Sequence, residues 1–194
     1  SAMHVHQSVV STDDGHNIFS GPDDTASPLF YWHIGGLQRY LPAILSLLAP
    51  NINSYRRIQR YNAAPINVQW GLDNRTVGLR VPDSTPQSRR VENRVPGADA
   101  NPYLAIAASL ACGLLGMINR IDPTAPISGS AYEMPYELPR SLEQSLVALN
   151  ECPELIEILG SHFVQAWTSV KEKEHETFLH VISSWEREHL LLNV

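Results

Sequence analysis

The stretch that most constrains the fold of this chain is Ser88–Tyr103, which reads SRRVENRVPGADANPY. Its first part has strand character, and side chains two residues apart on a strand lie on the same face. Arg90, Glu92 and Arg94 should therefore project together. One carboxylate between two guanidinium groups forms either an ion-pair ladder or a site for a metal and anions, and the strand pattern alone favours neither.

Helical patterns account for much of the remaining chain. Asn101 is a good helix N-cap and Pro102 suits a first turn, so a helix should follow the strand directly. The apolar run Tyr103–Ile118 predicts that this helix is almost wholly buried. Further helices are expected over Leu29–Leu48, kinked or divided at Pro42, and over Ser141–Leu149, Pro153–Leu159 and Ser161–Glu188.

Alternation of apolar and polar residues predicts strands over residues 1–10, Ile66–Trp70 and Thr76–Val81. The segment Gly71-Leu72-Asp73-Asn74 between the last two is a hairpin signal. Strands predicted in the first half of the chain and helices predicted mainly in the second half indicate an α+β domain. In it, one antiparallel β-sheet is backed by helices.

The first predicted strand carries two histidines on one face. His4, His6 and Ser8 fall on one side of it, while Val5 and Val9 point the other way. Two histidines at this spacing can ligate a metal or bind phosphate oxygens, and Ser8 adds a hydroxyl. The alternative is a half-exposed strand that happens to hold two histidines.

The distribution of charge is uneven. The chain has 194 residues and a formal net charge of −6, which argues against a nucleic-acid partner. Residues 53–94 nevertheless contain eight arginines, no lysine and only three acids, a local net charge of +5. Arginine in place of lysine favours bidentate recognition of a carboxylate or phosphate. The basic segment therefore predicts an anionic ligand, with a solvated arginine-rich surface as the alternative.

Location and partners follow from composition. The two cysteines, Cys112 and Cys152, do not form a C-x-x-C motif, and this usage indicates a reducing, cytoplasmic compartment without a disulfide framework. No apolar run approaches the roughly 20 residues that a membrane span needs, and no signal peptide is visible. We therefore expect no membrane partner.

Six motifs occur in a fixed order along the chain: Met3-His4-Val5-His6-Gln7-Ser8, Ile34-Gly35-Gly36, Asn53-Ser54-Tyr55-Arg56-Arg57, Asp73-Asn74-Arg75-Thr76, Arg89-Arg90-Val91-Glu92 and Ala100-Asn101-Pro102-Tyr103. With these motifs the chain resembles the C-terminal catalytic domain of the glutamine synthetase family. The match runs to the closing Trp185-Glu186-Arg187-Glu188-His189. Any one motif would be weak, whereas six in order at compatible spacing are very specific.

The resemblance implies an ATP-dependent ligase, which phosphorylates the γ-carboxylate of glutamate and then lets an amine displace the phosphate. It implies that His4 and Glu92 ligate Mg²⁺ or Mn²⁺ at the phosphates. The ATP site would hold His6, Gln7, Ser8, Arg75, Arg80 and Arg90. Glutamate would be bound by Arg57, Arg75 and Arg94, and of these Arg75 and Arg94 would act in catalysis.

Two departures bear on the acceptor amine. In members that use ammonia, a glutamate closes over the ammonium pocket six residues after the equivalent of Arg57, and here that position is Ala63. Family members often carry a lysine at the position of Gln87, near the nucleotide. The segments around Trp70–Arg75 and Val95–Pro102 most resemble the branch that uses organic amines, such as γ-glutamylputrescine synthetase. We expect an organic amine or polyamine, with ammonia, or a non-catalytic ligand-binding or regulatory role, as alternatives.

The resemblance also implies that residues 1–194 are an incomplete catalytic domain. The N-terminal β-grasp domain, the first part of the catalytic domain and further metal ligands of family members lie upstream of the His4 motif. The family site is completed by a neighbouring subunit of a homo-oligomer. The fragment alone should therefore be inactive and should expose apolar surface.

Overall fold

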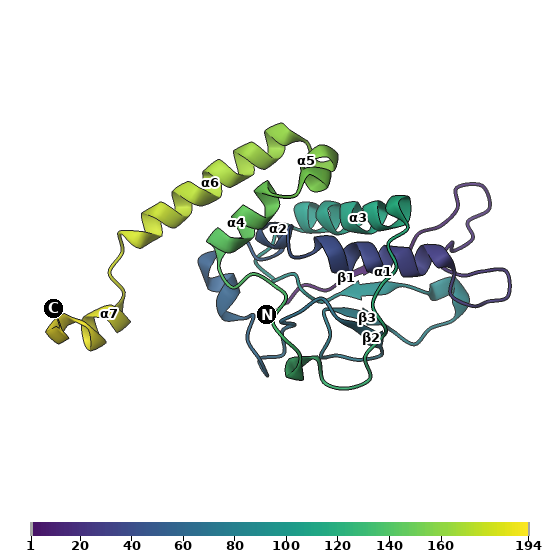
Figure 1. Ribbon diagram of the computed structural model, residues 1–194, viewed down its shortest axis with the longest axis horizontal. Coiled ribbons are helices and arrows are strands. Elements are labelled where there is room, and N and C mark those ends of the chain that lie inside the picture. Colours follow the sequence, from purple (N-terminus) through teal and green to yellow (C-terminus); the bar gives the residue numbers. More distant parts are fainter. Residues whose placement is uncertain (1, 194) are drawn as a thin grey trace.

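A small β-sheet and the helices packed on it form the body of the computed structural model, which describes residues 2–193 (Figure 1). The four strands have the order β1-β4-β3-β2 in the sheet. They are β1 (Val5–Gln7), β2 (Trp70–Leu72), β3 (Leu79–Val81) and β4 (Val91–Asn93). The α+β class predicted from the sequence is confirmed.

The predicted antiparallel pairing is correct for two of the strand pairs and wrong for the third. β4 runs antiparallel to both β1 and β3, whereas β2 and β3 are parallel, with Trp70 opposite Leu79. Gly71 and Leu72 continue β2 instead of reversing it, so Gly71–Asn74 is not a hairpin turn. The Asn74 side chain accepts hydrogen bonds from the backbone and hydroxyl of Thr76, which turns the chain into a crossover.

The helices of the first half are α1 (Pro28–Tyr40), α2 (Leu45–Leu48) and the 3₁₀ helices η1 (Ile52–Arg56) and η2 (Pro86–Ser88). The second half contains α3 (Pro102–Asn119), η3 (Ala131–Glu133), α4 (Leu142–Asn150), α5 (Pro153–Leu159), α6 (Ser161–Leu179), α7 (Ser184–His189) and η4 (Leu191–Asn193). The predicted division at Pro42 and the N-caps at Asn101 and Ser141 are confirmed.

The predicted single helix Ser161–Glu188 is wrong, because the chain leaves α6 at Leu179 and starts a new helix at Ser184. The Ser183 side chain accepts a hydrogen bond from the backbone of Glu186, and the Glu186 side chain accepts one from the backbone of Ser183. This capping box specifies a helix start in the middle of the apolar pattern. The end of α6 and α7 extend away from the body (Figure 1).

Helices α1 and α3 lie side by side over the sheet (Figure 1). They cross where Gly36 faces Gly116, and a Cβ atom on Gly36 would lie only 2.5 Å from the Gly116 Cα. This close contact brings the buried faces of both helices onto the sheet, where Ile34, Leu37 and Ala108 are fully buried. The layer gives β4 a rigid support.

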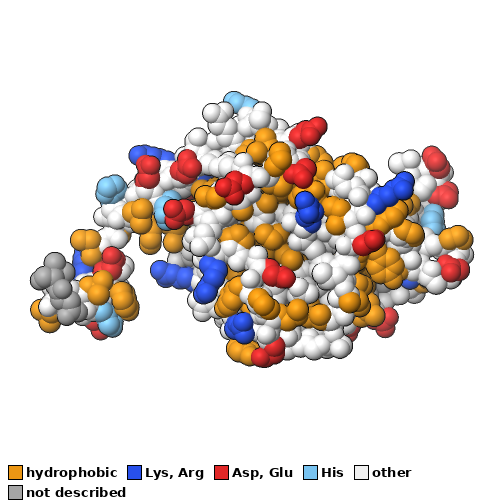
Figure 2. Space-filling model, in the orientation of Figure 1, with side chains coloured by type: hydrophobic (Ala, Val, Ile, Leu, Met, Phe, Trp, Pro, Cys, Tyr) orange, Lys and Arg blue, Asp and Glu red, His pale blue; other side chains and the backbone are white. Residues whose placement is uncertain are grey.

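The prediction that α3 is almost wholly buried is wrong. Tyr103, Ile106, Leu110, Leu114 and Ile118 are exposed, and their spacing of three or four residues places them on one face of the helix. Only the opposite face packs on α1. By length and composition α3 could also cross a membrane, but a core helix passes the same test. Apolar side chains are also exposed on the extended C-terminal part (Figure 2).

Candidate functional site

Glu92 lies at the centre of a polar cluster on the sheet. It sits on β4, is 2% exposed and has His6 and Arg80 as its direct neighbours on β1 and β3. Its carboxylate accepts hydrogen bonds from Arg80 at 2.7 Å and from Arg94 at 2.8 Å, and lies 2.7 Å from Nδ1 of His4. We call these five residues the Glu92 cluster. The cluster contains ion pairs, but the predicted ladder is only partly correct, because Arg80 from β3 and not Arg90 joins Arg94 in binding Glu92.

The environment of the cluster sets its charge states. Burial raises the pKa of Glu92, but the hydrogen bond from Arg80 and the charge of Arg94 lower it by more, and the net result is a lowered pKa. Burial lowers the pKa of His4, and the nearby Arg94 charge acts in the same direction. Near neutral pH the cluster therefore holds an ionised carboxylate beside an uncharged imidazole.

The other residues predicted to contact ATP are distributed over both faces of β1. His6 and Ser8 are exposed, and Nε of Arg90 lies 3.3 Å from Nδ1 of His6. Arg90 thus contacts His6 and not Glu92, whereas Arg94 does share the face of Glu92. Gln7 points the opposite way and is buried, and its amide has no hydrogen-bond partner among the described residues.

Two further arginines differ in their surroundings. Arg80 bonds Asp73 as well as Glu92, so its guanidinium joins the turn after β2 to the cluster. Arg75 lies in that turn, is exposed and forms no hydrogen bond or ion pair with the part of the chain that the structure describes. Its guanidinium is available to an external anion.

Arg57 lies directly after η1 and is held by the loop before α3. Its Nη2 donates a hydrogen bond to the Val95 carbonyl, while Nε and Nη1 are buried and have no partner within residues 2–193. Burial lowers the pKa of Arg57, and the nearby Asp99 carboxylate raises it. A fixed guanidinium with two unpaired donors suits a carboxylate ligand.

Sequence reasoning missed the residues that position Arg57. Asp99 accepts hydrogen bonds from the Ser54 hydroxyl at 2.6 Å and from the Asn51 amide at 3.1 Å, which fixes η1 to the loop. A Cβ atom on Gly97 would lie 2.2 Å from a carboxylate oxygen of Asp99, so only glycine leaves room for this arrangement. The one sequence signal was that Ser54 lies within a motif and that Gly97 and Asp99 lie in the segment Val95–Pro102.

The described residues provide only part of the ligand set that a metal ion needs. Among the described residues, no group of three or more His, Cys, Asp or Glu side chains is placed to hold a metal ion. His4 and Glu92 supply an imidazole nitrogen and a carboxylate oxygen 2.7 Å apart. Mg²⁺ commonly binds through one or two carboxylates and completes its shell with water and phosphate oxygens. These two residues therefore fit part of a metal site shared with a ligand.

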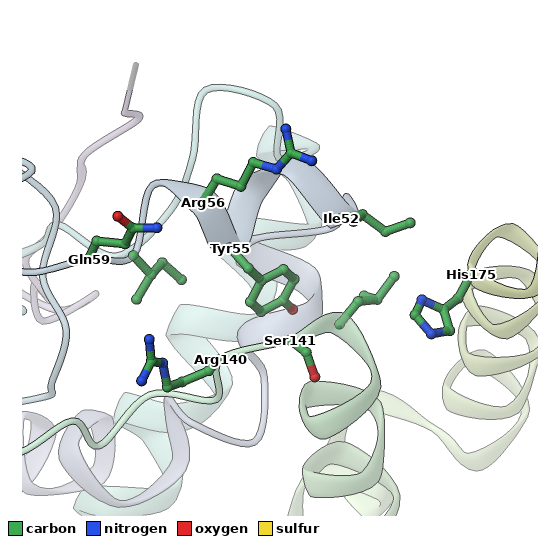
Figure 3. A pocket seen from close by; sticks show the side chains of 9 residues that line it. Ile52, Tyr55, Arg56, Gln59, Arg140, Ser141 and His175 are labelled. Carbon is green, nitrogen blue, oxygen red and sulfur yellow. The ribbon is translucent and has the colours of Figure 1, made fainter. Parts of the chain in front are cut away.

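A separate pocket of about 310 Å³ lies beside η1, between that helix, the start of α4 and α6 (Figure 3). It is lined by Ile52, Tyr55, Arg56, Ile58, Gln59, Arg140, Ser141, Leu142 and His175. None of these residues belongs to the Glu92 cluster. The pocket is therefore distinct from the candidate site.

Comparison with known proteins places the geometry in context. Residues 1–190 match the family model "glutamine synthetase, catalytic domain". The chain is 34% identical over 202 residues to glutamine synthetase of Thermotoga maritima, covering 98% of this chain and 46% of that protein. It is 38% identical to glutamate–isopropylamine ligase of a Pseudomonas species over 192 residues, covering 96% of this chain and 42% of the ligase.

A further relative and a solved structure are also similar to this chain over nearly its whole length. γ-Glutamylputrescine synthetase PuuA of Escherichia coli is 37% identical over 195 residues, which cover 100% of this chain and 41% of PuuA. The solved structure of a GmaS/ADP complex superposes with a TM-score of 0.86 at 30% identity, covering 98% of this chain and 46% of that chain. The chain thus spans less than half the length of these proteins.

Proposed function

The chain belongs to the glutamine synthetase family, and on that premise we propose that it forms part of an ATP-dependent ligase. The full-length protein would join glutamate to an amine as a γ-glutamyl amide, through γ-glutamyl phosphate. The observation that carries the proposal is the Glu92 cluster, in which fixed guanidinium groups surround one buried carboxylate on the sheet.

The arginines address the main physical difficulty of this reaction. ATP and glutamate are both anions, and they must meet with the γ-phosphate in line with the attacking carboxylate. Phosphoryl transfer depends on positioning and on charge neutralisation more than on covalent help. Guanidinium groups held in place by the protein supply both without reorganising during the reaction.

Each substrate has candidate partners. We assign the phosphates of ATP to Arg80, Arg90 and His6, with Ser8 directly after β1, whereas the buried Gln7 on the opposite face of β1 does not reach this ligand. Arg57, with its two unpaired buried donors, would hold the α-carboxylate of glutamate. Arg94, beside Glu92, would contact the reacting end of glutamate. These assignments leave the exposed Arg75 free to reach both substrates.

The metal would be Mg²⁺ or Mn²⁺. His4 and Glu92 would be its protein ligands in this chain, and the uncharged state of His4 near neutral pH is the one that can ligate. When bound, the ion would neutralise phosphate charge. Any further ligands would come from the nucleotide, from water or from residues outside this chain.

We propose an organic amine or polyamine as the acceptor. Two of the relatives are named for isopropylamine and putrescine, and their identities of 38% and 37% match or slightly exceed the 33% to 37% of the glutamine synthetases, so the support for this acceptor comes mainly from Ala63. Ala63 supplies no carboxylate to hold ammonium and leaves space for a carbon chain. The second candidate is glutamine formation from ammonia, which the Thermotoga relative supports.

We also propose that the full-length protein is a cytoplasmic homo-oligomer with additional domain segments. Cys112 and Cys152 are both free thiols, as a reducing compartment requires. The exposed apolar residues on α3 and on the C-terminal part offer surfaces for the missing segments and for neighbouring subunits.

Steady-state kinetics of the full-length protein test the acceptor. We expect phosphate release that depends on ATP, glutamate and an amine, with kcat/KM higher for putrescine, spermidine, ethanolamine or isopropylamine than for ammonia. If ammonia is favoured by tenfold or more, about 1.4 kcal/mol in transition-state binding, the enzyme makes glutamine instead. Nucleotide binding without any turnover would indicate a non-catalytic role.

A further inference from the structure

Two segments far apart in the sequence are joined beside the candidate site. The backbone amide of Arg60 donates to the Tyr136 hydroxyl at 3.3 Å, and the Arg60 side chain donates to the Met134 carbonyl at 3.1 Å. The Tyr61 hydroxyl donates to Oε1 of Glu133 at 2.5 Å. The loop that follows Arg57 therefore lies against the segment around η3.

The backbone of this loop adopts an uncommon conformation. Tyr61 has φ 59° and Ala63 has φ 55°, so two non-glycine residues within three positions are left-handed. Side chains with a Cβ avoid this region, and residues held there often lie at functional sites. The turn allows Tyr61 to reach Glu133.

Aromatic rings and a carboxylate meet at this point. The ring of Tyr61 lies 5.4 Å from the ring of Tyr132, at an angle of 51°. Within residues 2–193, Oε2 of Glu133 forms no hydrogen bond or ion pair, although the side chain is exposed. A carboxylate next to two electron-rich rings is the arrangement that binds an alkylammonium group.

This arrangement lies between the segments that carry Arg57 and Arg75. The backbone amide of Ala131, at the start of η3, donates a hydrogen bond at 2.9 Å to the hydroxyl of Thr76, the residue after Arg75, and the loop with Tyr61 follows Arg57. Arg60 precedes Tyr61 in the same loop, but its guanidinium donates to the Met134 carbonyl and lies 5.5 Å from the centre of the Tyr136 ring. The Glu133 carboxylate thus keeps an oxygen for a ligand.

We propose that Tyr61, Tyr132 and Glu133 bind the non-reacting, cationic end of a diamine acceptor. This inference rests on the proposed function. The nitrogen that attacks the acyl phosphate must be an uncharged amine. Its bond to the carbonyl carbon forms, the bond from that carbon to the phosphate oxygen breaks and releases inorganic phosphate, and the proton that the nitrogen loses passes to water. The Glu133 carboxylate would therefore bind the second amino group of the diamine, which stays protonated throughout the reaction.

Comparison of putrescine with n-butylamine tests the inference, because the two have the same four-carbon chain and differ in the second ammonium. In the full-length enzyme we expect putrescine to be favoured. Glu133→Gln should lower kcat/KM for putrescine at least tenfold and change that for butylamine less than twofold. Glu143→Gln, which alters an exposed glutamate on α4, should change neither.

Glu133→Asp keeps the charge and should retain part of the preference for putrescine, and thermal unfolding identifies any variant that fails to fold. Equal losses for both amines would mean that Glu133 only holds the Tyr61 loop in place, and this would overturn the inference. An unchanged ratio of kcat/KM for putrescine to that for butylamine, or a wild-type preference for butylamine, would also overturn it. A wild-type enzyme without any amine-dependent phosphate release would instead refute the proposed function.

Discussion

Replacing Glu92 with glutamine tests whether one buried carboxylate organises the sheet face. Glu92 is 2% exposed, and its oxygens accept hydrogen bonds from Arg80 and Arg94 at 2.7 and 2.8 Å. A glutamine keeps one oxygen as an acceptor but places an NH₂ donor against a guanidinium, which is also a donor. The substitution should therefore remove about one charge-assisted hydrogen bond.

The expected magnitude follows from the burial of the partners. The side chains of Arg80 and Arg94 are 17% and 10% exposed, so water can replace little of the lost interaction. A hydrogen bond to a charged group contributes about 1.5–3 kcal/mol, and we expect the free energy of unfolding to fall by about 2 kcal/mol. For a unit of 150–250 residues that corresponds to a decrease of roughly 4–8 °C in the midpoint of thermal unfolding, and the decrease is smaller in a longer full-length protein.

The effect should depend on pH with a definite sign. The folded pKa of Glu92 is below its ordinary value of 4.5, so the carboxylate stabilises the fold above that value. This stabilisation is lost as the pH falls through the folded pKa. The difference between wild type and Glu92→Gln should therefore be constant near neutral pH and should shrink as the pH falls below 4.5.

Thermal unfolding of the full-length protein in EDTA, from neutral to acidic pH, measures this difference without bound metal. Glu143→Gln is the matched control, because that glutamate is exposed on α4. An unchanged midpoint for Glu92→Gln would refute the argument from buried ion pairs. Separately, undiminished activity of the variant at limiting Mg²⁺ would mean that Glu92 is an ion-pair partner and not a metal ligand.

Three further predictions concern the same protein. Arg57→Lys should raise the KM for glutamate far more than the KM for ATP, because an ammonium cannot replace a bidentate guanidinium. The expected loss of binding free energy for glutamate is about 2 kcal/mol. Equal effects on both KM values would contradict this division of roles. Asp99→Ala should shift the same two KM values in the same direction but less, since it frees η1 from the loop, and Asp23→Ala in an exposed turn is the control. The 194-residue chain alone should show no glutamate-dependent ATP turnover, and turnover would overturn the view that it is incomplete. Its exposed apolar surface should bind the dye ANS, and Leu110→Glu should weaken that binding.

The sequence by itself determined the features that arise from neighbouring residues. The N-cap of α3 at Asn101, the N-cap of α4 at Ser141 and the alternation of β1 were all predicted and are confirmed. Each depends on hydrogen bonds or side-chain directions within a few residues, so the local sequence contains the whole signal. The motif order also indicated the family, which the comparisons then showed.

Only the tertiary structure decided which distant side chains meet. The contact of Asn51 with Asp99 joins residues 48 apart, and that of Tyr61 with Glu133 joins residues 72 apart. The parallel pairing of β2 with β3 and the exposed apolar face of α3 likewise depend on what packs beside them, not on their own residues. Periodicity shows that a helix has an apolar face, but the rest of the fold decides whether anything covers it.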